Sequence, residues 1–491
     1  MTRSAVDILT TTKSCSAVAG VALAAILAVS CEGSGSSFEP EESNSRPPNV
    51  IYLLADDLGY GDLGRYGQRL IRTPNLDQLA TEGMVFTQHY AGSTVCAPSR
   101  ASLMGGLHTG HTVIRGNREV QPEGQHPIPD SRITLAERMR AAGYRTAAIG
   151  KWGLGAPDTE GVATRQGFDY FFGYNGQREA HSYYPDHLWR NEERVDLEGN
   201  QAGARGIYSH DLLVEEVLRF VRDAAGAPFF LYVPFTIPHA GLDVPENSMA
   251  PYLGHFEETP SEKQGRYIAQ STPRAAFAGM VSRLDRDIGR IVDLVDDLGL
   301  AERTLIIFSS DNGPHQEGGA DPDFFGSRGG LRGFKRDLYE GGIRVPMIVR
   351  WPGVVAQGSE TNHVSAFWDL TPTLLELAGA PTAPNLDGLS FVPTLRGEVQ
   401  EAHDYLYWEF HPSYYHDQIW KQAVRMRDWK GVRLTGPVGS ESLTELYDLA
   451  SDPAELRDVA GSHPDVVAQL VQVMREAHAP SELFPFPGEL P

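Results

Sequence analysis

The sequence predicts an α/β protein in which helices cover both faces of one large, mainly parallel β-sheet, followed by a small α+β domain at the carboxyl end. Short apolar segments alternate along the chain with longer segments of helical spacing, a pattern typical of parallel strands buried on both faces. Several apolar segments stop at polar residues, as strands do where a site lies beyond their carboxyl ends. After about residue 385 the pattern changes to alternating segments rich in aromatic residues.

The first predicted strand is the apolar run that starts at Asn49 and stops at Asp56 and Asp57. Similar runs predict strands at 144–150, 229–235, 304–310 and 343–350. Apolar spacing predicts helices at 75–82, from Ser99 onward, and at 133–142, 211–225, 275–298 and 367–378. Near the carboxyl end, alternation marks 404–410, 423–434 and 445–449, and a final helix is expected at 466–477. We therefore expect a main domain over 49–385 and a small α+β subdomain over 386–491.

The amino-terminal segment predicts export. Its apolar stretch, 17–29, is too short to span a bilayer comfortably and fits a signal peptide over 1–31. The stretch ends in Ala28-Val29-Ser30-Cys31, which resembles a bacterial lipobox; the alternative is an ordinary secretory signal with an incidental cysteine. Residues 32–48 are typical of a disordered tether. We expect a periplasmic or cell-surface lipoprotein, or a secreted protein, that meets the membrane only through a lipid anchor.

The composition excludes several classes of protein. The chain has 491 residues, of which 41% are hydrophobic, so it can bury a sizeable core. Its 64 acidic and 42 basic residues give a net charge of -22, which argues against nucleic acid as the main partner. Three cysteines are too few for a disulfide framework.

Two predicted strands end in paired oxygen ligands, Asp56-Asp57 and Asp311-Asn312. If both strands are parallel in one sheet, these side chains meet at one edge. Three carboxylates and an amide oxygen suit a hard divalent cation such as Ca²⁺ or Mg²⁺. The alternative is that each pair caps a following helix or turn.

A second candidate site is the segment Cys96-Ala97-Pro98-Ser99-Arg100. A cysteine at the start of a helix lies at the positive end of the helix dipole, where unpaired amides favour an anion. Arg100, one turn further on, can direct its guanidinium group to the same place. The alternative is a buried structural cysteine before a helix that begins with proline.

The spacing Cys96-x-Pro98-Ser99-Arg100 resembles the signature of the formylglycine-dependent sulfatases, which belong to the alkaline phosphatase-like superfamily. Further motifs follow in the order of that family: Gly59-Tyr60-Gly61-Asp62, Gly150-Lys151-Trp152, Pro238-His239, Asp311-Asn312-Gly313, Arg332-Gly333-Phe334-Lys335, Tyr339-Glu340-Gly341-Gly342 and Glu445-Leu446-Tyr447-Asp448-Leu449. The resemblance implies an alkaline phosphatase-like fold and a catalytic domain over 49–385.

The resemblance also implies the cofactors. Cys96 would be oxidised to formylglycine by a formylglycine-generating enzyme or an anaerobic sulfatase-maturing enzyme. Ca²⁺ would be bound at a site formed by Asp56, Asp57, Cys96, Asp311 and Asn312. In the implied mechanism the hydrated aldehyde attacks sulfur with one hydroxyl, and its second hydroxyl then expels sulfate.

Further residues have implied roles. Arg100 favours the charged form of the attacking hydroxyl, Lys151 and Lys335 would bind the sulfate oxygens, and His239 would donate a proton to the leaving alcohol. The sequence departs from the family at Gly153, where the family commonly has histidine. The loop that contains Arg178 and His181 provides candidates for substrate binding, with His181 as a base or substrate ligand; the alternative is a surface histidine.

We therefore expect a sulfatase that hydrolyses the sulfate ester of a carbohydrate or an aryl alcohol, with carbohydrate favoured because export suits extracellular polysaccharide fragments. One alternative is a phosphonate or phosphate monoester hydrolase of the same fold, whose anion and metal requirements overlap. A second alternative is a non-catalytic glycan-binding protein in which Cys96 stays unmodified.

Overall fold

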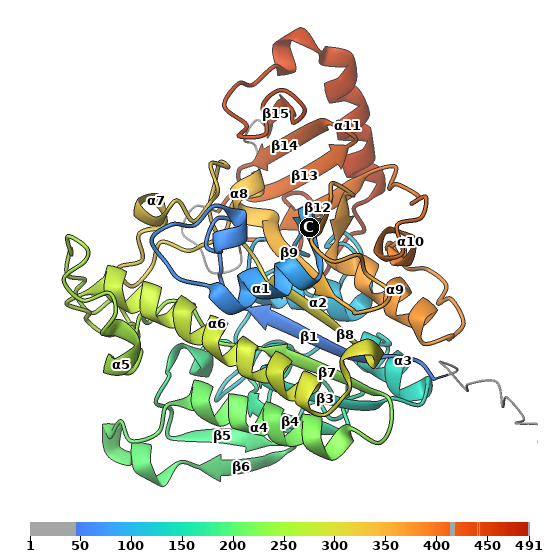
Figure 1. Cartoon of the computed structure of the whole chain (residues 1–491). Coiled ribbons are helices and arrows are strands. Elements are labelled where there is room, and N and C mark those ends of the chain that lie inside the picture. The colour runs from blue at the N-terminus through green and yellow to red at the C-terminus, as the bar shows by residue number, and fades with distance from the viewer. Residues whose placement is uncertain (1–45, 413–417, 439, 441, 490–491) are drawn as a thin grey trace, which may run out of the picture. The chain divides into compact units, whose positions relative to one another are not determined.

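The computed structural model describes residues 46–489 except 413–417, 439 and 441. Its larger sheet has 11 strands in the order β10-β2-β9-β8-β1-β7-β3-β4-β5-β6, with β11 beside β2 (Figure 1). These are β1 (Asn49–Ala55), β2 (Met84–Tyr90), β3 (Arg145–Lys151), β4 (Tyr170–Tyr174), β5 (His187–Arg190), β6 (Glu193–Asp196), β7 (Phe229–Pro234), β8 (Thr304–Ser310), β9 (Arg344–Arg350), β10 (Ser359–Thr361) and β11 (Ser365–Ala366). The central strands β8, β1, β7, β3 and β4 are parallel, whereas β9 and β5 run antiparallel to their neighbours.

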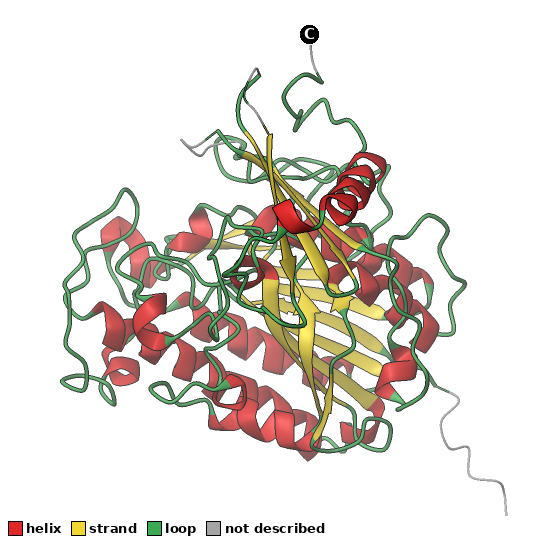
Figure 2. Ribbon diagram, turned by 90° about the horizontal axis from the view of Figure 1, so that it is seen from above, coloured by secondary structure: helices red, strands yellow, loops and turns green. Residues whose placement is uncertain are grey.

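Helices cover both faces of this sheet (Figure 2). One face packs against α1 (Pro74–Glu82), α4 (Ser209–Ala224) and α6 (Pro273–Asp297), and the other against α2 (Cys96–Gly105), α3 (Leu135–Ala141) and α9 (Leu370–Leu377). The side chains of β1 alternate between the two cores, with Ile51 and Leu53 in the first and Val50 and Tyr52 in the second. This alternation explains why the whole strand is apolar: both of its faces are buried.

Shorter helical segments connect these elements. The short α-helices are α5 (Glu246–Met249), α7 (Pro322–Phe325), α8 (Glu340–Ile343) and α10 (Val392–Leu395). Single 3₁₀ turns occupy Gly64–Tyr66, Glu179–His181, Glu198–Gly203, Ala301–Arg303, Phe367–Asp369 and Ala460–Ser462. Among the described residues, no helix has both the length and the apolar character that crossing a bilayer requires.

The smaller sheet is antiparallel and lies within residues 386–491. Its four strands are β12 (Leu406–Phe410), β13 (Trp420–Met426), β14 (Trp429–Thr435) and β15 (Ser442–Asp448). One face packs against α11 (Pro464–Glu476) through Leu470 and Met474. The other face contributes Trp408 and Val432 to a core shared with Ile343 of α8. This second contact places the small sheet over the segment that precedes β9.

The structure confirms the predicted fold class and shows several differences in detail. The helix expected from Ser99 begins at Cys96, because proline is tolerated in a first helical turn. The stretch 423–434 is a hairpin of two strands with a turn at Arg427, whose φ is 56°. Strands β2, β4, β5 and β6 were not predicted. The predicted signal peptide, Cys31 and most of the tether lie outside the described residues.

Candidate active site

The carboxyl ends of β1 and β8 lie side by side and bring together four polar residues. Ala55 pairs with Ser310 in the parallel register, so Asp56-Asp57 and Asp311-Asn312 leave the sheet at the same edge. The backbone N–H of Asp57 donates to Asp311 Oδ1 at 3.1 Å, and Asn312 Nδ2 donates to Asp57 Oδ1 at 2.7 Å. All four side chains are fully buried. The convergence expected from two parallel strand ends is therefore present.

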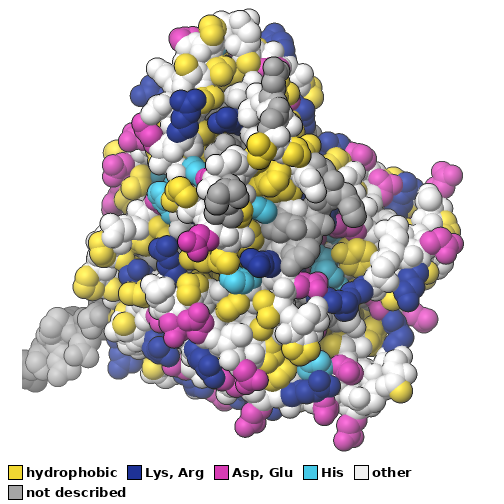
Figure 3. Space-filling model, turned by 180° about the vertical axis from the view of Figure 1, so that it is seen from behind, with side chains coloured by type: hydrophobic (Ala, Val, Ile, Leu, Met, Phe, Trp, Pro, Cys, Tyr) yellow, Lys and Arg dark blue, Asp and Glu magenta, His cyan; other side chains and the backbone are white. Residues whose placement is uncertain are grey.

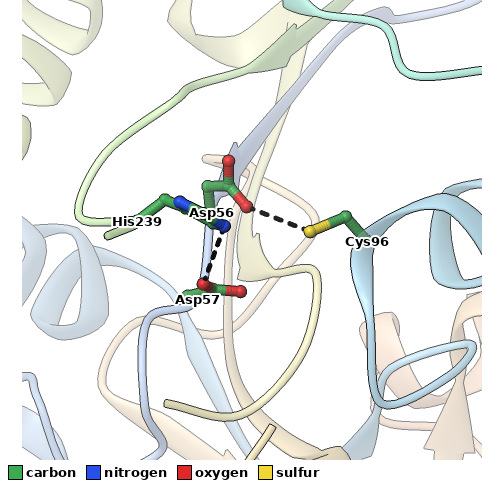
Figure 4. A group of neighbouring side chains, drawn as sticks. All are labelled: Asp56, Asp57, Cys96 and His239. Atoms are coloured by element: carbon green, nitrogen blue, oxygen red, sulfur yellow. Dashed lines mark hydrogen bonds and ion pairs between the residues drawn. The ribbon is translucent and has the colours of Figure 1, made fainter. Parts of the chain in front are cut away.

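Cys96 is the first residue of α2 and faces this cluster. Its Sγ lies 3.5 Å from Asp56 Oδ1 (Figure 4). The side-chain oxygen of Asn117 accepts the N–H of Ala97 at 3.1 Å and so binds one of the free amides at the helix start. Arg100, one turn along α2, donates to Asp311 Oδ2 from Nη2 at 2.8 Å and from Nε at 3.1 Å. The helix start therefore combines oriented amides with a buried guanidinium group.

Two lysines lie close to the Cys96 thiol. Lys151, the last residue of β3, places Nζ 2.7 Å from Asp56 Oδ2 and 3.4 Å from Cys96 Sγ. Lys335 places Nζ 2.7 Å from Asp57 Oδ2, 3.0 Å from His239 Nε2 and 3.8 Å from Cys96 Sγ. Both side chains are almost completely buried. A small anion that approached Cys96 would meet two ammonium groups removed from bulk water.

The electrostatics follow from this burial. Burial raises the pKa of Asp56 to about 7, although Lys151 opposes the shift. Burial also raises the pKa of Asp57, but the charges of Lys335, His315 and Lys151 together outweigh it and hold that pKa at about 2. Burial raises the pKa of the Cys96 thiol, so an unmodified thiol here is neutral at pH 7. Burial and then Lys335 lower the pKa of His239, which makes its imidazole neutral.

A cavity of about 320 Å³ opens onto Cys96. It is lined by Cys96, Asn117, Glu119, Gln125, Gln177, Arg178, His181, His239, Tyr267, Lys335 and Arg336. The His181 ring stacks on His239 with centroids 4.4 Å apart and planes at 13°, so it lies in the cavity wall. Arg178 is half-buried and pairs with Glu119 at 3.2 Å. Both residues expected to bind substrate thus line the cavity.

Gly153 stands where the family commonly has histidine, two residues after Lys151, and another side chain fills the space beside it. A Cβ atom added to Gly153 would lie 2.1 Å from Nε2 of Gln177, and the φ of Gly153 is +73°, which favours glycine. Gln177 Nε2 donates to the carbonyl of Gly153 at 3.3 Å. Gln177 therefore fills the space beside Lys151 that a longer residue at 153 would need.

The polar residues at the strand ends fit an oxygen-ligated divalent cation. Ligand atoms of Asp56, Asp57, Cys96 and His239 all lie within 4.8 Å of one another (Figure 4). The buried Oδ1 of Asn312 has no hydrogen-bond partner among the residues that the structure describes. An unpaired buried acceptor beside three carboxylates is costly unless a cation binds it. His239 was not expected in the metal group, where Nε2 lies 3.3 Å from Asp57 Oδ2.

The sequence pattern did not indicate several cavity residues, notably Asn117, Gln125, Gln177 and Tyr267. They lie in loops outside the family motifs, and Asn117 reaches the start of α2 from a distant part of the chain. On the face shown in Figure 3, acidic and basic side chains are interspersed.

Comparisons with known proteins agree with this geometry. The family model described as Sulfatase matches residues 48–380, and the model described as N-sulphoglucosamine sulphohydrolase, C-terminal, matches 331–479. Human arylsulfatase A is 33% identical over 87% of this chain and 87% of its own. Human N-acetylgalactosamine-6-sulfatase is 34% identical over 74% of this chain and 67% of its own. The crystal structure of Ps i-CgsB in complex with a neocarrahexaose superposes with a TM-score of 0.71 at 28% identity, covering 88% of this chain and 92% of that one.

Proposed function

This chain belongs to the sulfatase family, an enzyme family that hydrolyses sulfate esters, and from that premise we propose that it acts on a sulfated carbohydrate with a formylglycine made from Cys96 and a bound Ca²⁺ ion. The observation that carries the proposal is the pair of buried ammonium groups, Lys151 and Lys335, within 3.8 Å of Cys96 Sγ at the start of α2. This arrangement suits a tetrahedral anionic group such as a sulfate ester.

The cofactors would occupy the site as follows. A formylglycine at position 96 supplies a hydroxyl of its hydrated aldehyde as the nucleophile for sulfur. Ca²⁺ held by Asp56, Asp57, Asp311 and Asn312 supplies positive charge beside the sulfate. Asp56 and Asp57 now pair with Lys151 and Lys335 at 2.7 Å each. Lys151 and Lys335 would bind the sulfate oxygens.

His239 is placed to deliver a proton to the leaving alcohol. Its Nδ1 lies 3.1 Å from the carbonyl of Ala240, which can only accept, so Nδ1 carries the proton of the neutral ring. Its Nε2 faces Lys335 Nζ at 3.0 Å. Lys335 Nζ therefore donates a hydrogen bond to Nε2 and keeps its charge, and a proton taken up at Nε2 would be the one that His239 gives to the alkoxide formed as the S–O bond breaks.

The amide and aromatic side chains of the cavity wall favour a carbohydrate. Neutral amides of Asn117, Gln125 and Gln177 line it, and amides match sugar hydroxyls because both donate and accept hydrogen bonds. The rings of Tyr267 and His181, with centroids 5.5 Å apart, offer flat faces for a sugar ring. We assign His181 and Arg178 to substrate binding on this basis.

Turnover of matched substrates tests the proposed function. An aryl sulfate and the corresponding aryl phosphate should be compared with Ca²⁺ present, and the sulfate should be hydrolysed with the higher kcat/KM. A large preference for the phosphate would instead support a phosphate or phosphonate monoester hydrolase. A panel of defined sulfated saccharides then identifies the sugar and the position of the ester.

Mass spectrometry of the peptide that contains Cys96 tests the nucleophile. Protein from the native host should carry the aldehyde, formed by a formylglycine-generating or anaerobic sulfatase-maturing enzyme. An intact thiol, together with retained glycan binding and no turnover, would support the non-catalytic alternative.

We also propose that the protein is exported and anchored through lipid on Cys31. Metabolic labelling with a fatty acid should mark the wild-type protein and leave Cys31→Ser unlabelled. Label on both proteins, or on neither, would contradict the anchor.

A further inference from the structure

We propose that Lys421, on the small carboxy-terminal sheet, is a positioning residue that fixes the active-site Lys335 by holding the backbone of Arg336. The inference rests on the proposed role of Lys335 in binding the sulfate group. It assigns a part in catalysis to a residue whose own side chain does not line the cavity.

Arg336 has an unusual backbone conformation directly after Lys335. Its φ is 81°, in the left-handed region that non-glycine residues adopt rarely. Such a conformation persists only where the surrounding structure holds it, and it concentrates at functional sites. Arg336 directly follows Lys335, whose Nζ lies 3.8 Å from Cys96 Sγ.

Hydrogen bonds hold this backbone from both sides. The N–H of Lys335 donates to the carbonyl of Pro314 at 2.9 Å, and the N–H of Arg336 donates to the carbonyl of Thr94 at 3.0 Å, two residues before Cys96. The carbonyl of Arg336 accepts from Lys421 Nζ at 2.9 Å. Lys421 therefore adds a side-chain hydrogen bond to the carbonyl of the strained residue, whose guanidinium group also pairs with Glu317.

Lys421 is well placed to hold a fixed position. It lies on β13, paired with Phe410 of β12 on one side and with Leu434 of β14 on the other. Its residue is 8% exposed, and Nζ also lies 3.3 Å from Asp337 Oδ1. A buried ammonium that binds a carbonyl and a carboxylate makes stronger hydrogen bonds than a solvated surface charge.

The rest of the segment is anchored without Lys421. Arg332 donates to the hydroxyl of Tyr447 at 2.6 Å, and Glu340 pairs with Lys430 at 2.9 Å. Loss of the Lys421 contact should therefore let residues 335–337 relax locally while the ends of the segment stay in place. Because catalytic groups act only when held to within about half an ångström, this relaxation should slow turnover without unfolding the protein.

The test is Lys421→Met, which keeps the length of the side chain and removes the donor. We expect kcat on an aryl sulfate to fall at least tenfold, with KM changed less than threefold and the melting temperature lowered by no more than a few degrees. Lys421→Arg, which keeps a cationic donor, should recover most of kcat. Arg433→Met, on the same sheet and with an exposed side chain, is the matched control and should leave kcat unchanged.

A double-mutant cycle separates positioning from a general packing role. Asn adopts positive φ more readily than Arg, so Lys421→Met should cost much less in an Arg336→Asn background than in the wild type. Equal costs in both backgrounds, or a kcat within twofold of wild type for folded Lys421→Met, would overturn the proposal. If Lys421→Met does not fold, Lys421→Gln is tested in its place. If Lys421→Gln does not fold either, Lys421 is needed for stability and the proposal is overturned. The preference of the wild-type protein for aryl sulfate over aryl phosphate is measured first. A failure of the proposed function is then distinguished from a failure of the proposed role of Lys421.

Discussion

Replacing Lys430 with methionine should destabilise the protein strongly, and more strongly at high pH than at low pH. Lys430 Nζ lies 2.9 Å from Glu340 Oε1 and 2.9 Å from Glu455 Oε1, and all three side chains have no solvent exposure. Removing one partner of a buried ion pair leaves uncompensated charge and costs about 3–5 kcal/mol of unfolding free energy. Because solvent does not screen this cluster, we expect the full range at pH 8.

The pH dependence follows from the two carboxyl groups. Burial raises the pKa of Glu455 to about 7, against the effect of Lys430. Burial also raises the pKa of Glu340, but the charges of Lys430, Arg344 and Arg425 together outweigh it and hold that pKa at about 2. A carboxyl group whose pKa is higher in the folded state binds more protons there, so stability falls as pH rises from its unfolded pKa to its folded pKa. Without Lys430 both pKa values rise, so the cost of Lys430→Met should grow between pH 5.5 and pH 8.

Urea unfolding of the full chain, followed by tryptophan fluorescence at both pH values, measures this cost. The double variant Lys430→Met/Glu455→Gln removes one of the two carboxyl groups and should recover part of the loss at pH 8. Lys263→Met, at an exposed loop position, is the control and should change stability by less than about 0.5 kcal/mol. An equal loss of unfolding free energy at both pH values, or a loss below about 1 kcal/mol, would contradict the view that Lys430 compensates buried carboxylate charge.

Three further predictions concern the active site. Lys151→Ala should lower kcat by about 100- to 1,000-fold with the fold intact, as expected for loss of one preorganised group that stabilises developing charge; an unchanged kcat in steady-state assays would remove Lys151 from the mechanism. Chelation should abolish turnover, and added Ca²⁺ should restore it in the wild type but much less in Asn312→Leu. Elemental analysis should find less bound metal in this variant. Full restoration of turnover in the variant would exclude Asn312 as a ligand. Gly153→Ala should lower the melting temperature, since a Cβ there would lie 2.1 Å from Gln177 Nε2. In a Gln177→Ala background the same change should cost only the backbone strain of about 1–2 kcal/mol, and equal costs in both backgrounds would contradict this contact.

The sequence predicted the elements whose physics is local. Strands β1 and β8 were predicted because both of their faces are buried, so residues 50–55 and 305–308 form apolar runs, and because each strand is followed by a pair of polar residues. Strand β2 (MVFTQHY) mixes polar with apolar residues, since its Thr87 and Gln88 are only partly buried, and it has no such pattern. The turn at Arg427 lacks the Gly or Asn that usually marks a positive φ, so β13 and β14 appeared as one segment.

The predicted site residues were those carried by motifs at strand ends and at a helix start. Asp56, Asp57, Asp311 and Asn312 were expected to converge because parallel strands place their carboxyl ends together, and the structure brings them together. The amide-lined wall could not be predicted, because a loop residue such as Gln125 reaches the cavity only through tertiary contacts, here a hydrogen bond from its N–H to the carbonyl of Gly155 at 2.9 Å. The role of the small sheet in holding residues 332–340 likewise depends on contacts between segments about 85 residues apart, such as Lys421 with Arg336.

The burial of α2 has a consequence for biosynthesis. Cys96 is 1% exposed, and every residue from Cys96 to Met104 is buried. A maturing enzyme that binds residues on both sides of Cys96 cannot reach them in the folded protein unless the core unfolds. The proposed conversion of Cys96 therefore has to take place on the newly made chain, before folding closes over it. Molecules that fold before this conversion would keep the Cys96 thiol. The fraction of active enzyme in a cell should therefore depend on the rate of the conversion relative to the rate of folding.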